Sequence, residues 1–129
     1  MSREKTEAYY RTLTEDDLCS CDLCIVLRRE IASAYPYLAS LMDTLGVDIR
    51  KPFEVWPVGP LEDGRLFYPS VQYVVIGSRE GFEKKEIRGV TVDITDTHPM
   101  TDIEEEHFVI EASPIFIDAD PEEGTGKDV

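Results

Sequence analysis

The chain has 129 residues, of which 42% are hydrophobic and 9% aromatic, and its formal net charge is −14 at pH 7. A chain of this length folds as one domain and buries about two thirds of the surface that it exposes when unfolded. This composition excludes a wholly disordered chain and removes the need for disulfides. The longest apolar runs, such as Tyr73 to Ile76, fall far short of the roughly 20 residues that span a bilayer, which excludes a membrane protein.

The negative charge is concentrated in the last third of the chain. Residues 93–129 carry 12 acidic side chains against one basic side chain, Lys127. Nucleic acid is a poor partner for such a chain, because binding to phosphates depends largely on lysine and arginine. We expect a surface that binds a basic partner protein, the alternative being acidity that only maintains solubility. The candidate contact residues are Trp56, Asp96, Asp102, Glu104, Glu105 and Glu106.

The first elements in chain order are a polar lead and a helical turn. Residues 1–12 form the lead, which includes the aromatic pair Tyr9 and Tyr10. Thr14 is followed by three acidic residues, a pattern typical of a helix N-terminus, where free amide groups and the helix dipole attract negative charge. The sequence therefore predicts a short helical turn before the cysteines.

Two abutting helices, or one kinked helix, are predicted next, at residues 23–34 and 36–45. Apolar side chains recur there at the three- and four-residue spacing of one helix face. They are Leu27, Ile31, Ala34, Leu38, Leu41 and Leu45. Pro36 interrupts the pattern, because proline lacks a backbone donor and disfavours helical geometry at the residue before it. Gly46 supplies a left-handed stop.

Short segments rich in β-branched and aromatic residues follow, separated by glycine, proline and aspartate. The predicted strands are residues 53–56, 65–68, 71–77, 86–94 and 108–117. They are too closely spaced for the helical crossovers of a parallel sheet. We therefore expect an α+β fold in which the helices pack on one face of a four- to five-stranded, mainly antiparallel sheet. Residues 13–117 form this single domain, and residues 118–129 form an acidic tail that we expect to be disordered.

Three cysteines lie within six residues, at Cys19, Cys21 and Cys24, and the chain contains no others. The odd number, together with the lack of an apolar leader, predicts a reducing, cytoplasmic setting. In the default interpretation the thiols are small, half-buried helix residues that line the core, and the protein needs no cofactor.

Two functional interpretations of the cysteines remain open. The three thiols could bind zinc, with His98 or His107, the only histidines, as the fourth ligand. Cys21 and Cys24 could instead form a redox pair, because the N-terminus of a helix stabilises a thiolate. Both histidines could also be ordinary surface residues.

Familiar catalytic signatures are absent, since the chain has no glycine-rich phosphate loop, no G-x-S-x-G and no H-E-x-x-H. A non-enzymatic protein is therefore favoured. The leading hypothesis is an interaction protein that binds a basic partner through its acidic C-terminal half. The alternative is a metal-binding or thiol-redox domain.

Several short segments taken together resemble a group of small acidic bacterial proteins of unassigned function. The segments are Cys21-Asp22-Leu23-Cys24, Leu45-Gly46-Val47-Asp48, Lys51-Pro52, Gln72-Tyr73-Val74-Val75-Ile76-Gly77, His98-Pro99 and Glu104-Glu105-Glu106-His107-Phe108-Val109. This resemblance implies no activity and no functional residues. In size and charge the chain is also similar to immunity proteins that neutralise secreted toxins, which is an analogy without a shared motif.

Overall fold

The computed structural model describes residues 1–118. This part of the chain contains the helices α1 (Arg3–Thr12), α2 (Asp22–Ala34) and α3 (Pro36–Leu45), and a single 3-10 turn at Glu15–Asp17. Its strands are β1 (Glu54–Trp56), β2 (Gly59–Pro60), β3 (Leu66–Tyr68), β4 (Ser70–Ile76), β5 (Lys85–Ile87), β6 (Val90–Thr95), β7 (His107–Ser113) and β8 (Ile115–Ile117).

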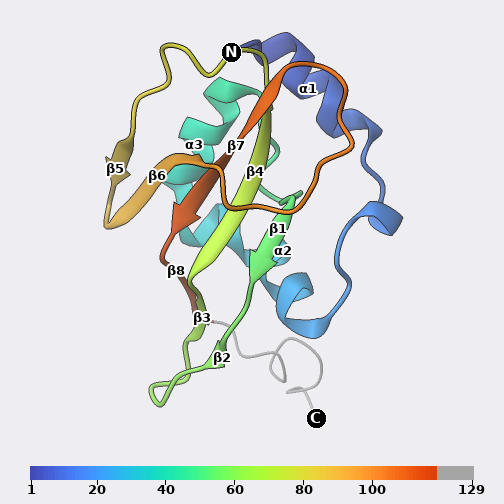
Figure 1. Cartoon of the computed structure of the whole chain (residues 1–129). Helices are drawn as coiled ribbons and strands as arrows, with labels where there is room; N and C mark the ends of the chain where they lie inside the picture. Colours follow the sequence, from blue (N-terminus) through green and yellow to red (C-terminus); the bar gives the residue numbers. More distant parts are fainter. Residues whose placement is uncertain (119–129) are drawn as a thin grey trace.

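All strand pairs are antiparallel. Five strands form the main sheet in the order β1-β4-β7-β6-β5, and β2, β3 and β8 form a small second sheet (Figure 1). The predicted α+β class and the antiparallel sheet are confirmed.

Two predicted strands are each divided in the structure. A turn with positive φ at Arg88 and Gly89 separates β5 from β6, where one strand was expected over residues 86–94. Pro114, which follows a cis peptide bond, separates β7 from β8, and β8 joins the second sheet. The strand β2 has too few residues to give a periodic signal and was not predicted.

The helices α2 and α3 pack on one face of the main sheet. Their inward side chains include Leu27, Ile31 and Met42, which are fully buried against sheet residues such as Tyr73 and Val75. Burial of each such aliphatic side chain contributes about 1.5–3 kcal/mol relative to exposure. Of the apolar stripe from which the helices were predicted, Leu27, Ile31 and Leu38 are buried and Leu41 and Leu45 are partly buried, whereas Ala34 is exposed.

The boundaries of these helices follow local chemistry. Pro36 occupies the first position of α3, where the missing donor is harmless, and Tyr35 lies between the two helices. Gly46 ends α3 with φ +82°, and a β-carbon there would collide with the carbonyl of Arg3. Both predicted boundaries are confirmed.

The helix α1 occupies the segment that the sequence indicated only as a polar lead. It lies along the part of β4 that the short strand β1 does not reach. The Ser2 amide donates to the Ile76 carbonyl at 2.9 Å, and the Thr6 hydroxyl accepts from the Ile76 amide at 3.0 Å. Thr6 and Tyr10 are buried. Residues 1–12 are thus an integral part of the fold.

The predicted acidic tail, residues 118–129, lies outside the described residues except for Asp118. Among residues 1–118, no helix has the length and apolar character needed to cross a membrane.

Candidate metal centre

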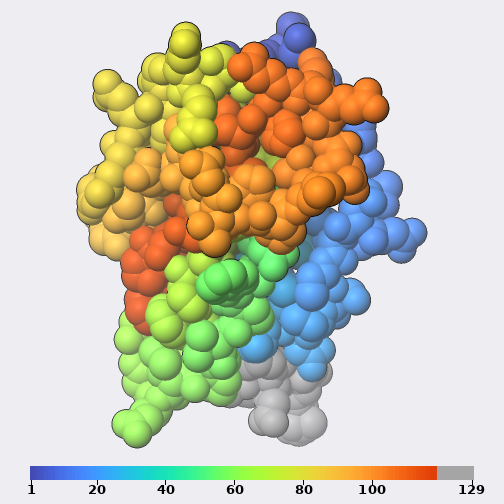
Figure 2. Space-filling view, in the orientation of Figure 1, coloured from blue at the N-terminus to red at the C-terminus, as the bar shows by residue number. Residues whose placement is uncertain are grey.

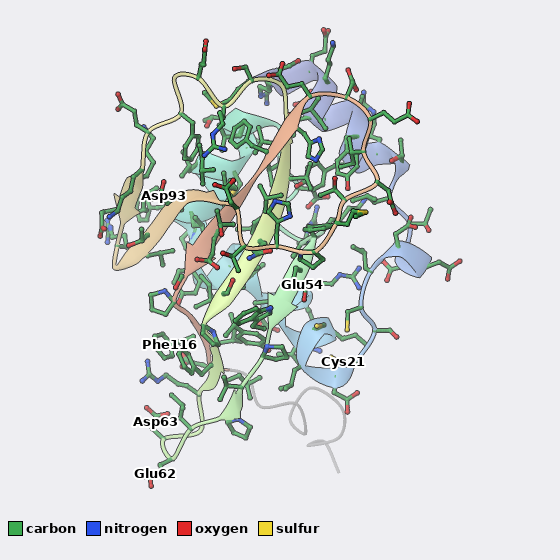
Figure 3. The ribbon with its side chains drawn as sticks, in the orientation of Figure 1. Cys21, Glu54, Glu62, Asp63, Asp93 and Phe116 are labelled. Atoms are coloured by element: carbon green, nitrogen blue, oxygen red, sulfur yellow. The ribbon has the colours of Figure 1, made fainter. Side chains whose placement is uncertain are left out.

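The three cysteines converge at the start of α2. Their sulfur atoms all lie within 4.8 Å of one another, and all three thiols are free. Cys19 and Cys21 are exposed to solvent, whereas Cys24 is buried. Figure 3 shows Cys21 at the N-terminal end of α2, beside the strand β1. Three sulfur donors at this separation form a site that can hold a metal ion.

The local sequence explains this convergence. The Thr14 amide donates to the Asp17 carboxylate at 2.8 Å, which closes the 3-10 turn, and a short loop then leads to Cys21. Cys21 is the N-cap of α2, and Cys24 lies in its first turn. The spacing of three residues therefore places both side chains at the same helix end, and the preceding loop brings Cys19 back to them.

Contacts from neighbouring elements hold the segment that carries Cys19. The Arg28 guanidinium donates to the Glu15 carboxylate at 2.8 Å. The Lys51 ammonium donates to the carbonyl oxygens of Tyr10 and Leu13 at 3.0 and 3.1 Å. The loop is thus fastened to α2 and to the segment before β1.

The environments of the three thiols differ. The Cys21 amide donates to the Cys19 sulfur at 3.5 Å, and this hydrogen bond, supported by the Cys24 thiol, lowers the pKa of Cys19. The carboxylate of Glu54 opposes that shift in the pKa of Cys19. Burial raises the pKa of Cys24 well above its ordinary range. Cys19 therefore becomes a thiolate, the form that binds metals, more readily than Cys24.

The thiols lie in a cavity of about 230 Å³ between the start of α2 and the edge strand β1. Besides the three cysteines, its walls are formed by Asp17, Leu18, Arg28, Pro52, Phe53, Glu54, Val55 and Pro57. Asp17 and Glu54 bring carboxylates to this cavity.

The structure brings neither histidine into the cysteine cluster. His98 contacts the Pro99 carbonyl oxygen through Nδ1 at 2.7 Å, and its ring lies 6.2 Å from that of Phe53. His107 contacts Thr101 Oγ1 through Nε2 and the Glu105 carbonyl oxygen through Nδ1, both at 2.7 Å. Both nitrogens of His107 are thus engaged by its own loop, away from the thiols.

The acidic residues named as candidate contacts lie in the loop between β6 and β7. Asp96 pairs with Arg79 at 3.3 Å, and Glu105 pairs with Lys5 at 3.2 Å. The other three are exposed and make no ion pair with the described residues. They are Asp102, Glu104 and Glu106.

This loop covers part of the sheet face opposite α2 and α3. The Gln72 side chain donates to the Thr97 carbonyl at 3.0 Å, and Ile103 packs on Val74 and Val109. In Figure 2 the loop projects from the front of the molecule.

Trp56, the only tryptophan in the sequence and the remaining candidate contact residue, lies on β1 with 53% of its surface exposed.

Sequence reasoning missed a polar row on the same sheet face. The strand register places Glu54, Gln72, Glu111 and Asp93 side by side across β1, β4, β7 and β6. Alternation along β6, where Val90 and Val92 are buried, could have marked Asp93 as facing outward. The pairing of the strands could not be read in this way, because it joins residues that lie far apart in the sequence.

No protein-family model, no curated protein and no solved structure matches the chain. The function is therefore argued from the geometry of the site itself.

Proposed function

We propose that Cys19, Cys21 and Cys24 bind a thiophilic metal ion, with zinc as the first candidate. The observation that carries this proposal is the convergence of three free sulfur atoms within 4.8 Å. Zinc–sulfur bonds of about 2.3 Å in a tetrahedron place neighbouring sulfurs about 3.8 Å apart. The 4.8 Å limit within which the three sulfurs lie is about 1 Å above that spacing.

The exposure of the thiols favours this proposal over the alternatives. As half-buried helix residues that only line the core, the cysteines would all lie in α2 and be partly covered, yet Cys19 and Cys21 precede the first residue of α2 and are exposed. A thioredoxin-like redox site would follow a β-strand. Here a 3-10 turn at Glu15–Asp17 precedes the cysteines.

Metal analysis tests the proposal directly. Protein purified without a histidine tag is expected to bind on the order of one zinc ion per chain in a competition titration. Cys21→Ser should weaken binding by at least about tenfold. Ser20→Ala, in the same loop, is the matched control and should bind zinc as the native chain does. Absence of tight zinc, copper(I) or cobalt(II) binding by the reduced protein would reject the proposal.

A second candidate function is binding of a basic protein through the loop between β6 and β7. Its support is the position of Asp102, Glu104 and Glu106, which are exposed, have no ion-pair partner in residues 1–118, and belong to a loop that lies over one sheet face. Charge complementarity of this kind accelerates association and makes it sensitive to salt.

The experiment compares two triple variants with the same change in charge. A lysate of the native host is passed over the native chain, over D102N/E104Q/E106Q, and over E62Q/E80Q/E83Q, whose acids are exposed elsewhere. A basic protein should be retained at low salt by the native chain and by the second variant, and lost from the first. Equal retention by both variants would show non-specific attraction and reject this function.

A further inference from the structure

A site with three thiols leaves one position of a zinc tetrahedron without a protein ligand. Structural zinc sites are four-coordinate, and the fourth ligand is a cysteine, histidine or carboxylate side chain. Both histidines lie outside the cluster, as their ring contacts show. The chain has no fourth cysteine. The remaining candidates are the two acidic residues that line the cavity, Asp17 and Glu54, which also lie outside the 4.8 Å cluster but share its cavity.

Asp17 is already engaged. Its Oδ2 accepts hydrogen bonds from the Thr14 amide at 2.8 Å and from the Thr14 hydroxyl at 3.2 Å. These bonds close the 3-10 turn that leads to Cys19. Recruitment of Asp17 by a metal would open this turn and disturb the loop that carries one of the thiols.

Glu54 is free to move. Within residues 1–118 its carboxylate has neither a hydrogen-bond donor nor an ion-pair partner. Arg28 lines the same cavity, but its guanidinium donates to the Arg50 carbonyl at 3.1 Å and to Glu15 at 2.8 Å. The Glu54 side chain is partly exposed, so rotation at its three torsions is not blocked by tight packing.

Glu54 lines the same cavity as the thiols. Its side chain leaves β1 on the sheet face opposite α2, beside Gln72, and turns around the free edge of the strand to reach them. β1 pairs with β4 on one side only, and its other edge borders the cavity at the start of α2. Figure 3 shows Glu54 on β1 beside the segment that carries Cys21.

We propose that Glu54 supplies the fourth ligand and completes a metal site of three thiolates and one carboxylate, which joins the loop before α2 to the edge of the main sheet. This inference rests on the proposed metal-binding function. A carboxylate oxygen binds zinc at about 2.0–2.2 Å. A divalent cation converts the repulsion between this carboxylate and the thiolates into attraction, and each bound thiol releases its proton to water.

Cobalt(II) is the probe that separates the two proposals, because its spectrum reports thiolate ligation and coordination geometry separately. The native chain should show sulfur-to-cobalt charge transfer together with the intense visible bands of a tetrahedral site. E54A should retain the charge-transfer band, since the thiols remain, and should change the visible bands as water replaces the carboxylate. Its zinc affinity should fall by about tenfold or more.

Three variants serve as controls. E54Q removes the charge while it keeps the shape of the side chain, and it should weaken zinc binding as E54A does. D17N tests the other carboxylate of the cavity, and E62Q removes one exposed acid in the turn between β2 and β3, away from the cluster (Figure 3). Both should bind zinc within about twofold of the native chain. The metal-free melting temperature of each variant shows whether it is folded.

The outcomes are distinct. Absence of sulfur-to-cobalt charge transfer in the native chain would reject the metal site itself. Charge transfer in the native chain with unchanged visible bands and unchanged zinc affinity in E54A would leave the thiol site in place and overturn the role of Glu54. Unchanged zinc affinity in E54A would overturn it equally if D17N lost affinity.

Discussion

The phenol oxygen of Tyr10 accepts a hydrogen bond from the Val74 amide at 3.0 Å and donates one to the Val74 carbonyl at 2.8 Å. Strand β1 pairs only with residues 70–72 of β4, so this edge of the sheet would otherwise leave backbone groups unpaired. A hydroxyl group both donates and accepts, which allows one tyrosine to satisfy both polar groups of a residue. The helix α1 thereby replaces a missing strand.

Tyr10→Phe should destabilise the protein by about 1–3 kcal/mol, because it leaves a buried amide and a buried carbonyl without partners. Urea denaturation followed by circular dichroism measures the free energy of unfolding. Tyr9→Phe is the matched control, since Tyr9 is only partly buried and its hydroxyl has no hydrogen-bond partner in residues 1–118. Equal losses of stability in the two variants would contradict this explanation of the Tyr10 contact.

Removal of residues 1–12 should cause a larger loss than any single substitution. The shortened chain would expose the edge of β4 at Val74 and Ile76, together with the apolar surface beneath Tyr10. Exposed sheet edges promote association between chains. We expect a markedly lower melting temperature and oligomers in size-exclusion chromatography. A monomer with native stability would show that this segment is dispensable.

A second tyrosine satisfies both backbone groups of a residue at the edge of the small sheet. The Tyr35 hydroxyl accepts from the Phe116 amide at 2.8 Å and donates to its carbonyl at 3.1 Å, which ties the junction of α2 and α3 to β8. Two tyrosines from the helical part of the chain therefore complete the backbone hydrogen bonding of two different sheets.

Alkaline pH should unfold the protein through its buried tyrosines. Burial raises the pKa of Tyr10, Tyr68 and Tyr73 above the ordinary value of 10.0. Because the pKa is higher in the folded state, the stabilisation is fully present below about pH 10 and is lost as the pH rises beyond it. Each group then costs about 1.4 kcal/mol per pH unit until its folded pKa is reached.

Phenolate absorbance and circular dichroism, recorded together as the pH is raised, check this prediction. The absorbance of the buried tyrosines should increase in the same cooperative step in which the secondary structure is lost. Tyr73→Phe should reduce the pH dependence of stability in this range, since it removes one of the groups whose pKa burial raises. Ionisation of all tyrosines while the fold persists would be inconsistent with their burial.

The sequence predicted those parts of the fold that depend on local chemistry. Pro36 and Gly46 punctuate an apolar helical pattern, and the helices begin and end there. The helix α1 escaped notice because its contacts with the sheet depend on the hydroxyls of Thr6 and Tyr10, and hydroxyl groups give no apolar periodicity. Its contribution becomes visible only when the incomplete edge of β4 is known.

The candidate site was likewise predictable only in the part that depends on residues close together in the sequence. The clustering of Cys19, Cys21 and Cys24 is a property of the sequence, and the structure confirms that the sulfur atoms meet. The nearest carboxylates could not be predicted, because the strand that carries Glu54 and the helix that carries Cys24 come together only through the tertiary fold. The two histidines were candidate ligands only because of their residue type. They lie in and next to the loop between β6 and β7, where their ring nitrogens contact that loop and not the thiols.

Removal of the metal should leave the fold intact. The main cluster of buried apolar residues is formed by the helices and both sheets and includes none of the three cysteines, although Cys24 is buried beside it. We therefore expect the core to be stable without a bound ion. Zinc should therefore raise the free energy of unfolding only according to its concentration and affinity, by about 2.7 kcal/mol at a free concentration one hundred times Kd, and the melting temperature should rise with it. Hydrogen exchange of the chelated and loaded protein should differ chiefly in residues 13–24 and in β1. Global unfolding upon chelation would instead mean that the ion is a structural element on which the whole domain depends, as in small zinc-dependent domains.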